Sequence, residues 1–341
     1  VLQDNAFESA SLFETDFITN QDALLREIVD DFWRVELYPA SPLFIRHAWQ
    51  NGLTPESLLQ FVKQGLAWPL LEVIPRTEKP DPKSQTALEE AVWKAYQALG
   101  AAWVSSKAAV SEILLNYEGL NRSIYRRQAV ENDLRELNAY VSSQSPLSFP
   151  AGFEKFCSSK LTKSLKGTYT SPQHAFFDRC EDFRNVCAAL QNSFRQSVLA
   201  LKITLAGFVR SELRKRKQQQ HLRSFDDLLL DLHDVLAGPG RQLLAKSLRQ
   251  RYVAALIDEF QDTDPLQYAI FQSLFSSEPT VVGPTAVGPA AVGPTADGET
   301  AVFLIGDPKQ AIYSFRGADV FAYLQAARDV EERLTLDRNW R

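Results

Sequence analysis

The spacing of apolar residues predicts helices through the first two-thirds of the chain. Helices are predicted at residues 20–33, 85–115, 124–141 and 175–220. The first and the last have one apolar face, whereas 124–141 is polar on most of its surface. The last is long enough to leave one compact body and enter another. Thr54-Pro55-Glu56 predicts a further helix start, with Thr54 as N-cap and Pro55 in the first turn. Residues 146–172 carry Gly, Pro and Ser with little periodicity and are expected to form a connector.

Two short apolar runs near the end of the chain predict strands instead. Val253 to Ile257 leads into Asp258-Glu259, and Ala301 to Ile305 leads into Gly306-Asp307-Pro308-Lys309-Gln310. In a parallel α/β sheet, ligands bind beyond the carboxyl ends of the strands. We therefore expect two neighbouring buried strands to present four polar side chains along one edge, namely Asp258, Glu259, Asp307 and Gln310.

The adjacent acids after the first strand suit the chemistry of a nucleoside triphosphate. A carboxylate at a strand end can hold Mg²⁺, usually through water, and a second can orient or deprotonate the attacking water. Asp258 fits the first role and Glu259 the second. Paired acids after a strand also act as simple caps of the following helix, so this pair alone leaves both interpretations open.

Three longer motifs favour the catalytic interpretation. Asp258 to Gln267 resembles motif II, the Walker B element, of superfamily 1 DNA helicases. Leu304 to Asp319 resembles motif III of the same group, and Leu336 to Arg341 resembles motif IV. The residues of motif III are most similar to those of RecB-type subunits, the beta subunits of exodeoxyribonuclease V. The segment from Asn5 to Glu14 also resembles these subunits. Three motifs in this order are more specific than any one of them.

The resemblance implies an α/β fold that is mostly α by content. Residues 1–220 would form a large all-α insertion, called domain 1B in this family. Residues 221–335 would form the later half of a RecA-like P-loop ATPase domain, called 1A, with motif IV beginning at 336–341. Ser224-Phe225-Asp226-Asp227 resembles an element that leads back into this core, and by itself Ser224 is a helix N-cap. Repeated Val-Gly-Pro units predict a mobile surface loop at 280–298.

The same resemblance implies roles for residues in motifs III and IV. Gln310 would sense the terminal phosphate, Trp340 would stack on the nucleotide base, and Arg341 would reach the γ-phosphate as an arginine finger. Tyr313 and Phe315 of motif III would stack on bases of single-stranded DNA. Arg316, which follows them, would link the phosphate site to the DNA site. Relatives often have tryptophan where Phe315 stands. Without the motifs, Gln310 and Arg341 would be plain surface residues and the aromatic residues would belong to the core.

Charge and cysteine content narrow the partners and the compartment. The net charge of −5 gives no global basic field, so DNA contacts need local patches. Arg214-Lys215-Arg216-Lys217 is one such run; it is either a solvated helix end or a phosphate contact. Cys157, Cys180 and Cys187 lack disulfide or zinc spacing and are expected to be reduced core thiols of a cytoplasmic protein. No apolar run is expected to span a membrane.

Together these features predict a piece of an ATP-dependent, Mg²⁺-requiring 3′–5′ DNA helicase subunit. By resemblance, the parent would act on duplex ends and single strands with RecC-like and RecD-like partners, in double-strand break repair by homologous recombination. No Gly-x-x-x-x-Gly-Lys-Ser/Thr occurs in the 341 residues, so this stretch alone is expected to be inactive. The alternatives are a DNA- or partner-docking module, or a UvrD/Rep-like or AddA-like helicase.

Overall fold

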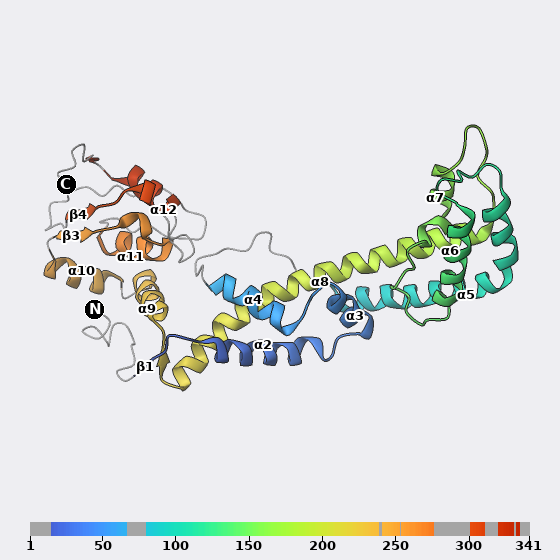
Figure 1. Ribbon diagram of the computed structural model, residues 1–341. Helices are drawn as coiled ribbons and strands as arrows, with labels where there is room; N and C mark the ends of the chain where they lie inside the picture. The colour runs from blue at the N-terminus through green and yellow to red at the C-terminus, as the bar shows by residue number, and fades with distance from the viewer. Residues whose placement is uncertain are drawn as a thin grey trace. The chain divides into compact units, whose positions relative to one another are not determined.

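The chain forms two compact units that are interleaved in sequence. The computed structural model describes residues 15–66, 80–238, 241–252, 254–275, 301–310, 320–330 and 332–334. Unit 1 comprises Val1–Phe32, Pro55–Ile74 and Leu205–Arg341, and unit 2 comprises Trp33–Thr54 and Pro75–Thr204. Most of the described residues are helical (Figure 1). Two helices, α2 (Asp22–Leu37) and α8 (Ala175–Gln219), contribute to both units, as predicted for the longer one.

Unit 2 is an all-helical body with an aromatic core. It contains α3 (Pro42–Gln50), α5 (Pro82–Asn116), α6 (Arg127–Tyr140), η1 (Phe153–Phe156), α7 (Ser158–Lys163) and the first part of α8 (Figure 1). Rings on α5, α6, η1 and α8 contact one another through Tyr96, Tyr140, Phe153 and Phe183. The three cysteines are free and buried, as predicted.

Residues 146–172 are more than the expected connector. They contain η1 and α7, and Phe153, Phe156 and Leu161 are buried in the core of unit 2. The two helices are only four and six residues long, too short for apolar spacing to reveal a helical face.

Helix α5 bears on the expectation about membranes. By length and composition alone it is apolar enough to cross one, which is weak evidence for a span. Its large apolar side chains at Val92, Leu99 and Trp103 are buried within unit 2. Only 22% of its most apolar stretch is buried, so packing in the core accounts for part of its hydropathy.

In unit 1, a cluster of leucines joins three short helices. These are α9 (Phe225–Ala237), α10 (Arg241–Arg251) and α11 (Pro265–Phe275), which pack through Leu236, Leu244, Leu248, Leu266, Ile270 and Leu274. Ser224 begins α9 with a capping box: its backbone N–H donates to Asp227 Oδ2 at 2.7 Å, and its side chain accepts from the backbone of the same residue. The predicted N-cap is confirmed.

The rest of unit 1 includes α4 (Pro55–Leu66) and a short parallel pair of strands, β1 (Asp16–Phe17) and β2 (Leu222–Arg223). Helix α4 begins at the predicted position. Within this unit, Phe32 of α2 lies 5.4 Å from Phe208 of α8, measured between ring centroids. The expected domain boundary near residue 220 stays a prediction.

The predicted strand pair is present and parallel. β3 (Ala254–Ile257) pairs with β4 (Ala301–Leu304), with Ile257 opposite Leu304. The pairing continues past both strands, because Ile305 N donates to Ile257 O and Phe260 N donates to Ile305 O, each at 2.8 Å. After these strands come η2 (Phe260–Asp262) and η3 (Pro308–Gln310), and α12 (Val320–Asp329) contacts η2. The expectation of adjacent parallel strands is confirmed.

Burial of these strands was predicted incorrectly. Exposed and partly buried positions alternate along both strands, and Leu256 and Phe303 are 69% and 54% exposed. A continuous apolar run was interpreted as a strand covered on both faces. In the described part of the chain, one face of this pair remains open.

Candidate functional site

The acids predicted from the sequence lie at the ends of β3 and β4. Asp258 and Glu259 follow β3, and Gly306 and Asp307 follow β4 on the neighbouring parallel strand. Asp258 Oδ1 accepts a hydrogen bond from Glu259 N at 2.9 Å, and both acidic residues are exposed. The structure therefore brings both segments to one edge, as expected, with the two carboxylates of β3 open to solvent.

Glu259 has an unusual backbone conformation. Its φ of 51° and ψ of 39° lie in the left-handed region, which costs a residue with a Cβ about 1–2 kcal/mol. Strain of this kind persists where surrounding contacts fix it, and it clusters at functional sites. The residue precedes η2 without a side-chain capping bond. Helix α11 is instead capped by Asp264, whose Oδ1 accepts from Gln267 N at 2.7 Å. A capping role for Glu259 is therefore not supported.

A glutamine that the sequence reasoning did not single out joins the two strand ends. Gln261 is 2% exposed; its Nε2 donates to Glu259 Oε2 at 2.5 Å, and its Oε1 accepts from Asp307 N at 3.0 Å. A Cβ on Gly306 would lie 2.6 Å from that Oε1, so only glycine leaves room for it. The available signal was its place inside motif II, two residues after Glu259.

Asp307 organises the loop after β4. Its Oδ2 accepts from Gln310 Nε2 and its Oδ1 accepts from Lys309 N, both at 3.0 Å. The hydrogen bond from Gln310, followed by that from the Lys309 backbone, holds the pKa of Asp307 below its usual range. Gln310, predicted to sense phosphate, is thus held close to the strand ends.

Aromatic side chains of unit 1 support these loops. Phe260 is buried, and its ring centroid lies 5.8 Å from that of Tyr268 and 6.1 Å from that of Tyr323. The Tyr323 hydroxyl donates to Gly306 O at 3.3 Å. Helices α11 and α12 therefore contact both strand ends, which limits the movement of the acidic residues that follow them.

The donor set fits one mode of metal binding. Among the described residues, no group of three or more His, Cys, Asp or Glu side chains could hold a metal. Mg²⁺ bound with a nucleotide takes most of its ligands from water and phosphate, and only one or two carboxylates from the protein. Asp258 and Glu259 fit that arrangement and do not form a protein-only cage.

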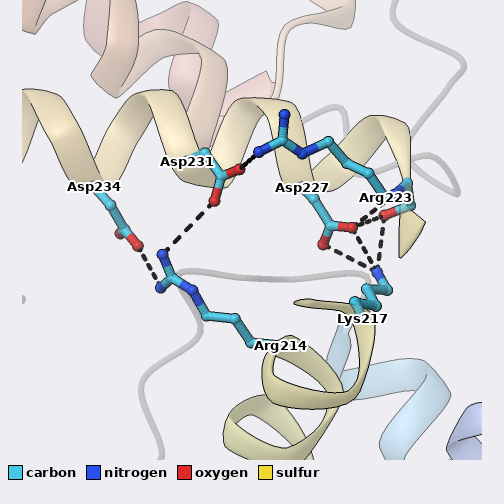
Figure 2. Close-up of polar contacts among 7 residues, drawn as sticks. Arg214, Lys217, Arg223, Asp227, Asp231 and Asp234 are labelled. Carbon is cyan, nitrogen blue, oxygen red and sulfur yellow. Dashed lines mark hydrogen bonds and ion pairs between the residues drawn. The ribbon is translucent and has the colours of Figure 1, made fainter. Parts of the chain in front are cut away.

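Cations of the basic run at the end of α8 are already paired within unit 1, and Figure 2 shows two of them, Arg214 and Lys217. Lys217 is 4% exposed; its Nζ lies 2.7 Å from Asp227 Oδ2 and donates to Ser224 Oγ at 3.0 Å. Arg214 contacts Asp234 at 2.8 Å. Further pairs join Arg216 to Asp31 and Arg223 to Asp231. A phosphate would have to compete with these carboxylates, and a buried Lys217 is not part of a solvated helix end.

Two exposed phenylalanines form a contact that the sequence reasoning missed. Phe17 on β1 and Phe225 at the start of α9 are 52% and 65% exposed, and their ring centroids are 5.4 Å apart at 31°. Pairing of β1 with β2 brings them together across more than 200 residues of sequence. Exposed aromatic faces of this kind are surfaces on which single-stranded bases stack.

Several predicted site residues lie outside the described residues. These are Tyr313, Phe315 and Arg316 of motif III, Trp340 and Arg341 of motif IV, the repeat loop at 280–298, and the segment from Asn5 to Glu14. Their roles stay predictions.

Comparison with known proteins adds independent information. Residues 104–331 match the family model of the UvrD/REP helicase N-terminal domain. The chain is 30% identical over 343 residues to RecBCD enzyme subunit RecB of Escherichia coli K12, covering 99% of this chain and 26% of that protein. It is 28% identical to the Haemophilus influenzae protein of the same name, covering 100% of this chain and 28% of that protein. Over 148 residues it is 37% identical to Mycobacterium tuberculosis RecB, covering 42% of this chain and 11% of that protein. The chain thus spans about a quarter of the length of the first two relatives.

Proposed function

Because this chain belongs to the UvrD/REP helicase N-terminal domain family, we propose that it forms part of the nucleotide site of a RecB-type, ATP-dependent DNA helicase subunit. The observation that carries the proposal is the parallel pairing of β3 with β4, which puts Asp258 and Glu259 beside Asp307. In this proposal, residues 221–335 belong to a RecA-like ATPase domain. Residues 1–220 form its helical insertion.

The proposed reaction is hydrolysis of ATP to ADP and phosphate. Glu259 orients the attacking water and accepts its proton as the water oxygen bonds to the γ-phosphorus and the bond to the β–γ bridging oxygen breaks. Asp258 would hold Mg²⁺, which would supply positive charge to offset the negative charge of the phosphates. Gln310 contacts the terminal phosphate. Trp340 and Arg341 are assigned to the base and the γ-phosphate from their motif alone.

The wider activity belongs to the same proposal. The parent subunit moves 3′ to 5′ along DNA, opens duplex ends, and acts in the cytoplasm with RecC-like and RecD-like subunits in double-strand break repair. The relatives' name, RecBCD enzyme subunit RecB, supports this assignment. Single-stranded DNA contacts Tyr313, Phe315 and Arg316 by motif, and the exposed pair Phe17 and Phe225 offers a further stacking surface.

Glu259→Gln in the complete subunit that contains this chain tests the catalytic assignment. Removing the base while keeping the side-chain volume should leave ATP binding intact and lower hydrolysis by about 10²–10⁴-fold. Glu136→Gln is the matched control, because Glu136 is an exposed acid on α6 in unit 2. Steady-state ATP turnover and binding of a fluorescent ATP analogue are measured for both variants. Wild-type hydrolysis by Glu259→Gln removes this residue from the base role.

Phe225→Ala tests the stacking surface. Loss of one aromatic stacking partner costs roughly 1–3 kcal/mol per base, so affinity for a single-stranded oligonucleotide should fall by about 5–150-fold. Leu243→Ala, at a 68% exposed position on α10, removes an exposed apolar side chain elsewhere in unit 1. If both variants bind the oligonucleotide like the wild type in an anisotropy titration, the pair is not a DNA contact.

The competing proposal is a DNA- or partner-docking module. It requires duplex binding that weakens with salt and on neutralising Arg214 to Lys217. The ion pairs of Arg214 and Lys217 in Figure 2, together with that of Arg216 with Asp31, favour the ATPase proposal, because carboxylates already occupy these three cations. Within the helicases, a UvrD/Rep-like or AddA-like parent would be distinguished by whether the complete subunit carries a carboxyl-terminal nuclease domain.

A further inference from the structure

The buried amide of Gln261 is fixed in one orientation. Its Nε2 faces Glu259 Oε2 at 2.5 Å and its Oε1 faces the N–H of Asp307 at 3.0 Å. If the amide nitrogen and oxygen exchanged places, the amide oxygen would face the Glu259 carboxylate, which is also an acceptor. The amide nitrogen would then face the N–H of Asp307, which is also a donor. The geometry therefore requires a side chain that donates to Glu259 and accepts from Asp307 at the same time.

A continuous series of contacts runs from Glu259 to Gln310. Gln261 connects Glu259 with the backbone of Asp307, and the Asp307 carboxylate accepts from Gln310 Nε2 at 3.0 Å. Gln310 must release Asp307 Oδ2 to donate the same N–H to a phosphate. Because Gln261 Oε1 accepts from the backbone N–H of Asp307, a movement of this loop would change the contact that holds the Gln261 amide.

We propose that Gln261 is a positioning residue, which holds the Glu259 carboxylate at the strand end and couples its position to the loop that carries Gln310. Glu259 is exposed and has a left-handed backbone, so a directional bond from a buried donor restricts an otherwise mobile side chain. Gln261 itself is held by the buried Phe260 beside it and by the close approach of Gly306. The inference rests on the proposed function, since it assumes that Glu259 acts on the attacking water.

Two substitutions distinguish the hydrogen bond that Gln261 donates to Glu259 from the one that it accepts from Asp307. Gln261→Glu keeps an oxygen for Asp307 N but replaces the donor that faces Glu259 with an acceptor. Gln261→Met keeps the side-chain volume and removes both hydrogen bonds without adding charge. A loss shared by the two variants therefore reports the missing donor, and a loss confined to Gln261→Glu reports the added charge. Gln242→Glu is the control for added charge, because Gln242 is an exposed residue on α10 in the same unit.

The experiment measures ATP turnover, ATP-analogue binding and hydrogen exchange of the complete subunit. In both Gln261 variants we expect kcat and the single-turnover hydrolysis rate to fall together by about 10–100-fold. The KM for ATP and the analogue affinity should stay within about twofold, with protection of the α9, α10 and α11 amides retained. Gln242→Glu should match the wild type. A fall in kcat with unchanged ATP affinity distinguishes the positioning of a catalytic group from a general structural role.

The contrary outcomes are distinct. Wild-type kcat in both Gln261 variants beside an inactive Glu259→Gln overturns this inference and leaves the proposed function standing. A loss confined to Gln261→Glu also overturns it, because the effect is then one of charge. Equal losses of kcat and ATP affinity, with loss of amide protection throughout α9, α10 and α11, assign Gln261 a purely structural role. Wild-type hydrolysis by Glu259→Gln overturns the proposed function and the inference with it.

Discussion

The four cations at the end of α8 should contribute very unequally to stability. Lys217 and Asp227 form an ion pair of 2.7 Å whose side chains are 5% and 25% exposed, whereas the Arg214 side chain is 58% exposed. We consider Lys217→Met, Asp227→Asn, their combination, and Arg214→Met. The sequence presents these cations as one basic run, so a ranking among them tests the structure directly.

The expected loss of stability in each variant depends on which charged side chain remains without its partner. Removing one partner of a buried ion pair costs about 3–5 kcal/mol, because the other charge stays buried and uncompensated. Asp227→Asn leaves the buried Lys217 ammonium without its counter-charge and should lower the stability by about 3–5 kcal/mol. Lys217→Met should cost less, about 2–3 kcal/mol, because Asp227 is partly exposed and still accepts from Ser224 N. Arg214→Met should cost under about 1 kcal/mol.

Hydrogen exchange is the suitable assay, because two units do not unfold as one transition. Amides of α9 should lose protection in Lys217→Met and Asp227→Asn, while those of α6 in unit 2 stay unchanged as an internal reference. The double variant should cost at least about 2 kcal/mol less than the sum of the single ones. Equal effects of Lys217→Met and Arg214→Met, or strict additivity, would refute the reasoning.

Three further predictions concern Gly306, Asp264 and two of the buried cysteines. Gly306→Ala places a Cβ 2.6 Å from Gln261 Oε1, so it should reproduce the kcat loss of Gln261→Met in the same turnover assay. Burial raises the pKa of Asp264 above 3.8, so the folded state favours its protonated form and loses stability as pH rises through that range. Asp264→Asn, which keeps the helix cap, should therefore be more stable than the wild type at neutral pH and no more stable below pH 3.8, measured by hydrogen exchange of the α11 amides. Burial raises the pKa of Cys157 and Cys187 to about 12, so maleimide labelling at neutral pH should be no faster than unfolding.

Features set by local periodicity could be predicted from the sequence. Helix α8 ends within one residue of its predicted limit, and Ser224 caps α9 as its residue type indicates. The pairing of β3 with β4 was predictable because each apolar run ends in a recognisable motif. These predictions use only residues that are close in sequence, or motifs whose order is informative.

Features set by long-range contact could not be predicted in this way. β1 and β2 have two residues each and are separated by more than 200 residues, so no periodicity marks their pairing or the Phe17–Phe225 contact. Burial of Lys217 depends on the turn that returns the chain from α8 to α9. The role of Gln261 depends on a glycine on the neighbouring strand, which leaves space for its amide.

The exposure of the strand-end acids has a consequence for catalysis. Asp258 and Glu259 are exposed, and a charge pair about 4 Å apart in water interacts by only about 1 kcal/mol, against about 4 kcal/mol at an effective dielectric constant of 20. In the proposed nucleotide site, their influence on a triphosphate would therefore depend on excluding water from this edge. Gln261 meets a different requirement, because it is buried and fixes the direction of Glu259 before any substrate arrives. Geometry at this site is thus supplied by the described residues, whereas the strength of its electrostatics depends on what covers it.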